Sequence, residues 1–142
     1  MLIELLAEPL WPLLNKFYRS HDSSMKALKG ARLWVAREGE IIAGLNLSPV
    51  VGGQWLTGLF VAQAYRKQGV AGRLIREAVA SVEGTVWLLC HPDLEGFYQR
   101  LGFTQDTRLP QSLAERLVRY KRNKPMIAMG LEPLARLTFH KV

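Results

Sequence analysis

The fold is decided by the stretch Leu59-Phe60-Val61-Ala62-Gln63-Ala64-Tyr65-Arg66-Lys67-Gln68-Gly69-Val70-Ala71-Gly72-Arg73-Leu74. It begins as an apolar run typical of a β-strand, passes through a polar turn with an arginine and two glycines, and ends in an amphipathic segment typical of a helix. A helix that starts after such a turn leaves backbone N–H groups free, and its dipole favours negative charge there. The stretch therefore predicts either a phosphate or pyrophosphate site, or an ordinary strand–helix turn with basic residues on its surface.

The turn lacks the signatures of the common nucleotide-binding loops. No Gly-Lys-Ser or Gly-Lys-Thr follows it, as a P-loop requires, and the G-x-G-x-x-G spacing of dinucleotide-binding proteins is absent. In the shorter loop formed here, Gly69 allows the backbone to approach a ligand closely, while Ala71 and Gly72 keep the first helical turn uncrowded.

The segments on either side of this stretch predict an α/β fold, with a mixed sheet of the α+β type and helices on both faces. The strands expected in the first half are residues 2–6, 32–37, 41–47 and 54–61, of which the last three form an antiparallel meander. A helix is expected over 9–19. Residues 71–82 have the apolar spacing of a helix that Gly84 ends, and the apolar run 85–90 predicts a buried strand. A strand, a helix and a strand in this order imply a parallel β-α-β crossover.

Beyond residue 90 the pattern predicts two more helices and a last strand. A short helix over 94–101 ends at Gly102, and Ser112-Leu113-Ala114-Glu115 matches a capping box that starts a helix running to about Lys121. Residues 126–131 predict the last strand. The chain of 142 residues is expected to form one domain, because no linker-like or repetitive segment divides it.

Composition and charge restrict the class of protein. The single cysteine, Cys90, excludes an intramolecular disulfide and fits a reducing compartment. No apolar run approaches the roughly 18 residues of a membrane span, and the N-terminus lacks the cationic start of a secretory signal, so the expected location is cytoplasmic. The formal net charge of +7 suits a polyanionic cofactor, nucleic acid or an anionic surface.

The basic segment 116–124 carries part of this charge. Its cations and interleaved Tyr120 are compatible with binding along a nucleic-acid backbone. However, Leu113, Leu117 and Tyr120 share one apolar helical face, which leaves the charges on the solvated side. A nucleic-acid partner is therefore not expected. No metal ion is expected either, and a homodimer is compatible with the sequence.

A second motif follows the predicted buried strand: Phe97-Tyr98-x-x-Leu101-Gly102-Phe103. Together with the preceding strands and the Arg66-x-x-Gly69-x-Ala71 loop, it resembles the GNAT superfamily of acetyl-CoA-dependent N-acetyltransferases over residues 55–103. The resemblance implies a GNAT-like fold and an enzyme that transfers an acetyl group from acetyl-CoA to a primary amine. On this resemblance, the acceptor is expected to be a small molecule or a peptide whose amine attacks directly in a ternary complex.

The resemblance also assigns roles to residues of this chain. The loop whose backbone amides bind the coenzyme A pyrophosphate is matched by Arg66, Lys67, Gln68, Gly69, Val70, Ala71 and Gly72. The strand end where the backbone pairs with the pantetheine arm, and where an N–H polarises the thioester carbonyl, is matched by Leu59, Phe60 and Val61. Tyr98 matches the tyrosine that commonly protonates the departing thiolate, and a phenol with a pKa near ~10 stays protonated at neutral pH.

Two positions depart from the family pattern. His91 stands seven residues before the tyrosine, where members often have Asn, and Leu94 stands four before it, where a small residue is common. His91 is therefore a candidate contact to the pantetheine or a candidate base, and a solvated loop residue is the alternative. Cys90 is a candidate nucleophile for a route through an acetyl-cysteine intermediate. The alternative is that it serves only as a small buried apolar side chain.

The general base is unassigned, which keeps a second function open. Members that use a strand glutamate would need a carboxylate near Thr57 or Gly58, and neither residue supplies one. His91, Asp93, Glu95 or an ordered water are the alternatives. A non-catalytic acyl-CoA-sensing module that binds a protein partner needs no base at all. The acceptor itself has no signature, and residues 17–31, 54–58 and the segment after 104 are expected to line its pocket.

Overall fold

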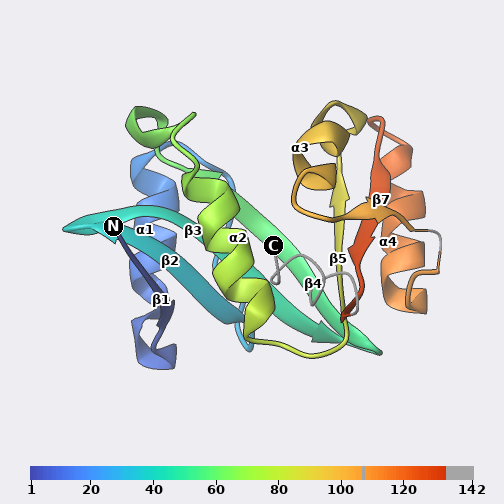
Figure 1. The fold of residues 1–142 in the computed structure, drawn as a ribbon, viewed down its shortest axis with the longest axis horizontal. Helices are drawn as coiled ribbons and strands as arrows, with labels where there is room; N and C mark the ends of the chain where they lie inside the picture. The colour runs from blue at the N-terminus through green and yellow to red at the C-terminus, as the bar shows by residue number, and fades with distance from the viewer. Residues whose placement is uncertain (107, 134–142) are drawn as a thin grey trace. The chain divides into compact units, whose positions relative to one another are not determined.

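The computed structural model describes residues 1–106 and 108–133, which contain seven strands and four α-helices (Figure 1). The strands are β1 (Leu2–Leu6), β2 (Arg32–Glu38), β3 (Glu40–Val50), β4 (Gly53–Val61), β5 (Thr85–Cys90), β6 (Thr104–Gln105) and β7 (Ile127–Leu131). The helices are α1 (Trp11–Ser20), α2 (Val70–Ala80), α3 (Glu95–Gln99) and α4 (Gln111–Lys121). The strand order in the sheet is β1-β2-β3-β4-β5-β7-β6. The mixed α/β sheet that the sequence predicts is confirmed.

Part of the segment expected to line the acceptor pocket, residues 107 and 134–142, lies outside the described residues.

The chain divides into two compact units, which are described separately. Unit 1 consists of residues 1–48 and 56–81, and unit 2 of residues 49–55 and the chain from 82 onward.

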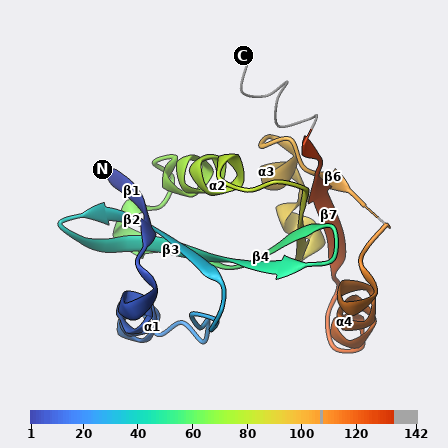
Figure 2. The same cartoon turned by 90° about the horizontal axis from the view of Figure 1, so that it is seen from below.

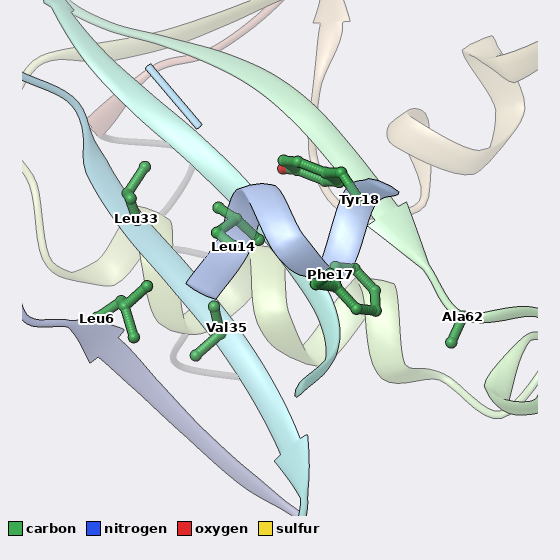
Figure 3. Packing of buried hydrophobic residues seen from close by; sticks show 7 residues of the cluster. All are labelled: Leu6, Leu14, Phe17, Tyr18, Leu33, Val35 and Ala62. Carbon is green, nitrogen blue, oxygen red and sulfur yellow. The ribbon is translucent and has the colours of Figure 1, made fainter. Parts of the chain in front are cut away.

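Unit 1 is an antiparallel sheet with a helix on each face. β1 pairs with β2, and β2 pairs with β3, both antiparallel, which confirms the predicted antiparallel pairing of the strands at 32–37 and 41–47. Figure 2 shows α1 and α2 on opposite faces of these strands. The apolar spacing of α1 buries Leu14, Phe17 and Tyr18 on one side of the helix. The core on this face is shown in Figure 3 and consists of Leu6, Leu14, Phe17, Tyr18, Leu33, Val35 and Ala62.

Unit 2 contains the parallel pairing that defines the crossover. β5 runs parallel to the first residues of β4, with Gly53 opposite Thr85 and Trp55 opposite Trp87. Its other edge pairs antiparallel with β7, which in turn pairs with β6. β5 has the bounds that the sequence predicts, and most of its side chains are buried. The short strand β6 was not expected, because two exposed residues carry no apolar alternation.

Three local predictions differ from the structure. α2 ends at Ala80 rather than at Gly84, and Gly84 instead adopts a φ of +78° where the chain turns into β5. The capping box is wrong, because α4 begins after Pro110, and Ser112 already lies inside the helix without capping it. The helix predicted over 94–101 is shorter and follows the 3-10 turn Pro92–Leu94, although Gly102 ends it in the left-handed conformation as expected.

No helix among the described residues is long and apolar enough to cross a membrane.

Candidate functional site

The loop between β4 and α2 lies in unit 1 and is held by its own side chains. Arg66 donates from Nε to the carbonyl oxygen of Val61 at 2.9 Å. The same guanidinium lies over the ring of Phe60, with 5.2 Å between its carbon and the ring centroid. Gln68 donates from Nε2 to the carbonyl oxygen of Ala64 at 3.1 Å. The arginine of the predicted motif therefore connects the loop to the end of β4.

The N-terminus of α2 is open and follows two residues in the left-handed conformation. Lys67 has a φ of 64° and Gly69 a φ of 79°, and Gly69 is the N-cap, which gives no side-chain hydrogen bond. The N–H of Arg73 donates to the carbonyl of Gly69 at 3.1 Å, so the N–H groups of residues 70–72 precede the first intrahelical bond. Apart from Gly69 itself and its two chain neighbours, no described residue has an atom within 4 Å of the position that a Cβ at Gly69 would take. Backbone donors at this helix end are therefore accessible to an anion.

The charge of this region is positive. Arg66, Lys67 and Arg73 are exposed on the loop and the first helical turn, and α2 carries no acidic residue in that turn. An anion here gains from these cations as well as from the helix dipole.

A second feature of unit 1 joins the end of α1 to β4. Gly58 lies inside β4 with a φ of +67°, and its carbonyl accepts a hydrogen bond from the Tyr18 hydroxyl at 2.6 Å. A Cβ on Gly58 would lie 2.5 Å from Asn46 Nδ2 and 2.9 Å from the Tyr18 oxygen, so only glycine fits. Burial raises the pKa of Tyr18 far above its usual value, and a hydrogen bond with Asn46 lowers it less. Tyr18 is therefore a permanent donor to the strand.

Asn46 fixes residues 21–31, the segment between α1 and β2. This side chain is completely buried, accepts from the N–H of Leu28 at 2.8 Å and donates to the carbonyl of Lys26 at 3.2 Å. Asn15 on α1 accepts from the N–H of Ala27 at 2.8 Å. The sequence analysis missed Tyr18 and Asn46. A glycine within the apolar strand pattern was the available signal, because such glycines often mark a bulge or a close approach.

In unit 2, Tyr98 on α3 is buried between two aromatic rings. Its ring makes edge contacts with Phe97 and Phe103, at centroid distances of 5.0 and 5.8 Å. Burial raises the pKa of Tyr98 to about 12, and the nearby Cys90 contributes to the rise. The Tyr98 hydroxyl therefore keeps its proton at neutral pH.

The strand end of β5 places Cys90 and His91 in different environments. Cys90 is buried, and burial raises the pKa of its thiol to about 11, with the Glu95 carboxylate adding to the rise. The exposed His91 caps the following turn, because its Nδ1 accepts from the N–H of Asp93 at 3.0 Å.

No group of three or more potential metal ligands occurs within residues 1–106 and 108–133.

The family model of the acetyltransferase (GNAT) domain matches residues 29–105, which is more than half of the chain. The chain belongs to the GNAT acetyltransferase family. No curated protein sequence matches it significantly.

Solved GNAT structures share this fold at low sequence identity. ElaA from Escherichia coli is 19% identical with a TM-score of 0.63, covering 91% of this chain and 94% of its own. Rv2747 from Mycobacterium tuberculosis, solved in complex with CoA and NLQ, is 14% identical with a TM-score of 0.67, covering 93% and 99%. The ribosomal-protein-S18-alanine N-acetyltransferase from Escherichia coli is 17% identical with a TM-score of 0.61, covering 92% of each chain. At these identities the likeness shows the GNAT fold alone.

The structure brings some of the predicted GNAT site residues together within a unit. In unit 1, Phe60 and Val61 both contact Arg66, and the loop leads directly into the open N-terminus of α2. In unit 2, Tyr98 is near Cys90, whereas His91 is engaged with its own turn. His91, which departs from the family pattern at this position, therefore has a structural role as the cap of the turn that follows β5.

Proposed function

We propose that the chain is an N-acetyltransferase that transfers the acetyl group of acetyl-CoA to a primary amine by direct attack in a ternary complex. The observation that carries the proposal is the open, cationic N-terminus of α2, preceded by left-handed Lys67 and Gly69, in a chain of the GNAT family. The amides of residues 68–72 would donate to the pyrophosphate, where the helix dipole also favours its charge.

The chemistry assigned to β4 is stabilisation of the oxyanion. Residues 59–61 would pair with the pantetheine arm, and one of their N–H groups would donate to the thioester carbonyl oxygen as negative charge develops there. Arg66 supports this assignment, since its hydrogen bond to Val61 and its contact with Phe60 fix the end of the strand.

Tyr98 is assigned as the general acid. The amine nitrogen bonds to the carbonyl carbon, the C–S bond breaks, and the departing thiolate takes the phenol proton. A phenol with a pKa of about 12 is still protonated when the thiolate departs. The proton lost by the amine goes to a base or an ordered water, for which His91, Asp93 and Glu95 are the side-chain candidates.

Direct attack is favoured over an acetyl-cysteine intermediate by the state of Cys90. The thiolate is the nucleophilic form of cysteine, and a buried thiol with a pKa of about 11 is almost entirely protonated at neutral pH. The role of a small buried apolar side chain therefore suits Cys90 better than the role of a nucleophile.

The proposal is tested by binding and turnover measured on the same preparation. Calorimetry should show that acetyl-CoA binds, and thiol release should then appear with at least one amine from a panel of amino acids, polyamines and lysine peptides. Absence of acetyl-CoA binding contradicts the proposal. Binding without release on any acceptor favours the non-catalytic acyl-CoA-sensing module, which the lack of a carboxylate near Thr57 and Gly58 permits.

A further inference from the structure

The peptide unit between Gly58 and Leu59 is held from one side. The Tyr18 hydroxyl donates to its carbonyl at 2.6 Å, from a residue forty positions earlier in the sequence. In a planar trans peptide the C=O and the following N–H point in opposite directions. The N–H of Leu59 is therefore directed away from Tyr18 and from α1.

The position of this peptide differs from that of its neighbours in β4. Gly58 has a φ of +67°, whereas a regular strand residue has a negative φ, so the peptide leaves the normal alternation of the strand. Asn46 closes the space beside it, since its Nδ2 would lie 2.5 Å from a Cβ at this position. Asn46 itself cannot move freely, because it is fully buried and bonded to the backbone at Leu28 and Lys26. The orientation of the peptide is thus set by two buried side chains.

We infer that Tyr18 is a positioning residue for acetyl transfer: by holding the Gly58 carbonyl, it aims the N–H of Leu59 at the thioester carbonyl of acetyl-CoA. The inference rests on the proposed function and deepens it, because it selects one donor among residues 59–61. Without the Tyr18 hydroxyl, the Gly58 carbonyl loses its partner, and only the packing of Asn46 still restrains the peptide. The N–H then no longer meets the developing oxyanion in the geometry that stabilises it.

Kinetics of Tyr18→Phe test the positioning role against a matched control. Ser81→Ala removes a hydroxyl that donates to the carbonyl of Ala78, also at 2.6 Å and also within unit 1, at the end of α2. Tyr18→Phe should lower kcat about 10- to 100-fold, with the KM for acetyl-CoA changed less than about twofold. Ser81→Ala should leave both values unchanged. A kcat for Tyr18→Phe equal to that of Ser81→Ala overturns the inference.

The wild-type protein provides a test that needs no substitution. In amide NMR spectra, the Leu59 proton should move further downfield with acetyl-CoA than with CoA, because only acetyl-CoA offers the carbonyl acceptor. In Tyr18→Phe this difference should shrink or vanish. Equal Leu59 shifts with both ligands overturn the inference and leave the proposed function intact, whereas failure of either ligand to bind overturns both.

Discussion

Replacing Gly58 by alanine tests whether the buried cluster at β4 is as tightly constrained as its geometry indicates. Two separate costs are expected. A non-glycine residue in the left-handed conformation costs about 1–2 kcal/mol. The new Cβ would also lie 2.5 Å from Asn46 Nδ2 and 2.9 Å from the Tyr18 oxygen, and forcing buried neighbours apart costs about 1–3 kcal/mol more.

The control isolates the second cost. Gly39, in the turn between β2 and β3, has a φ of +76°, and apart from Gly39 and its chain neighbours no described residue has an atom within 4 Å of its would-be Cβ. Gly39→Ala therefore includes the conformational cost and the reduced entropy of the unfolded chain, but no contact cost. Gly58→Ala should lower the free energy of unfolding by about 2–5 kcal/mol, which is about 1–3 kcal/mol more than Gly39→Ala.

Urea unfolding followed by circular dichroism measures both variants under the same conditions. The reasoning is refuted if the two glycine variants lose the same free energy of unfolding. That result would mean that Asn46 and Tyr18 yield to a methyl group at no cost, and that they do not fix the peptide.

Three further predictions concern buried polar groups. Asn46→Ala should lower the free energy of unfolding by about 2–4 kcal/mol in urea, because it leaves Leu28 N–H and Lys26 C=O unpaired; a loss below about 1 kcal/mol contradicts this. Cys90→Ala should retain kcat within about threefold, since a thiol with a pKa of about 11 is no nucleophile at neutral pH; a loss beyond about 100-fold would indicate an acetyl-cysteine route. Burial raises the pKa of Tyr98 to about 12, whereas a phenol in the unfolded chain ionises near pH ~10. The protonated phenol therefore contributes its full stabilisation below about pH 10, and this contribution is lost as the pH rises to about 12. Urea unfolding should therefore show a smaller alkaline loss of stability in Tyr98→Phe than in wild type, and identical losses would contradict the assignment.

The sequence predicts those parts of the fold that local patterns determine. The run 85–90 is continuously apolar because β5 has neighbours on both edges and buried side chains on both faces, and its bounds agree with the structure. The apolar spacing after Gly69 gives α2, whose buried side chains include Leu74, Ile75 and Ala78. The open helix N-terminus follows from the same short stretch, because the glycine and the absence of a capping side chain are both visible in the sequence.

Contacts between distant residues were beyond such patterns. Nothing near Tyr18 indicates that its hydroxyl meets a strand forty residues later, since this contact exists only once α1 lies on the sheet. The capping-box prediction failed because the N-cap of α4 is Pro110, two positions before Ser112, which the motif would place there. The arrangement of residues 21–31 was equally hidden, because this segment is held by Asn15 and Asn46 rather than by a local structure of its own.

Gly69→Val tests the proposal that the N-terminus of α2 binds the pyrophosphate of acetyl-CoA. Gly69 and Gly39 both have a positive φ and open space around the would-be Cβ, so Gly39→Val carries the same conformational cost away from the loop. Titration calorimetry with acetyl-CoA should show a Kd at least about tenfold higher for Gly69→Val and unchanged for Gly39→Val. An unchanged Kd in the folded Gly69→Val protein would contradict the account.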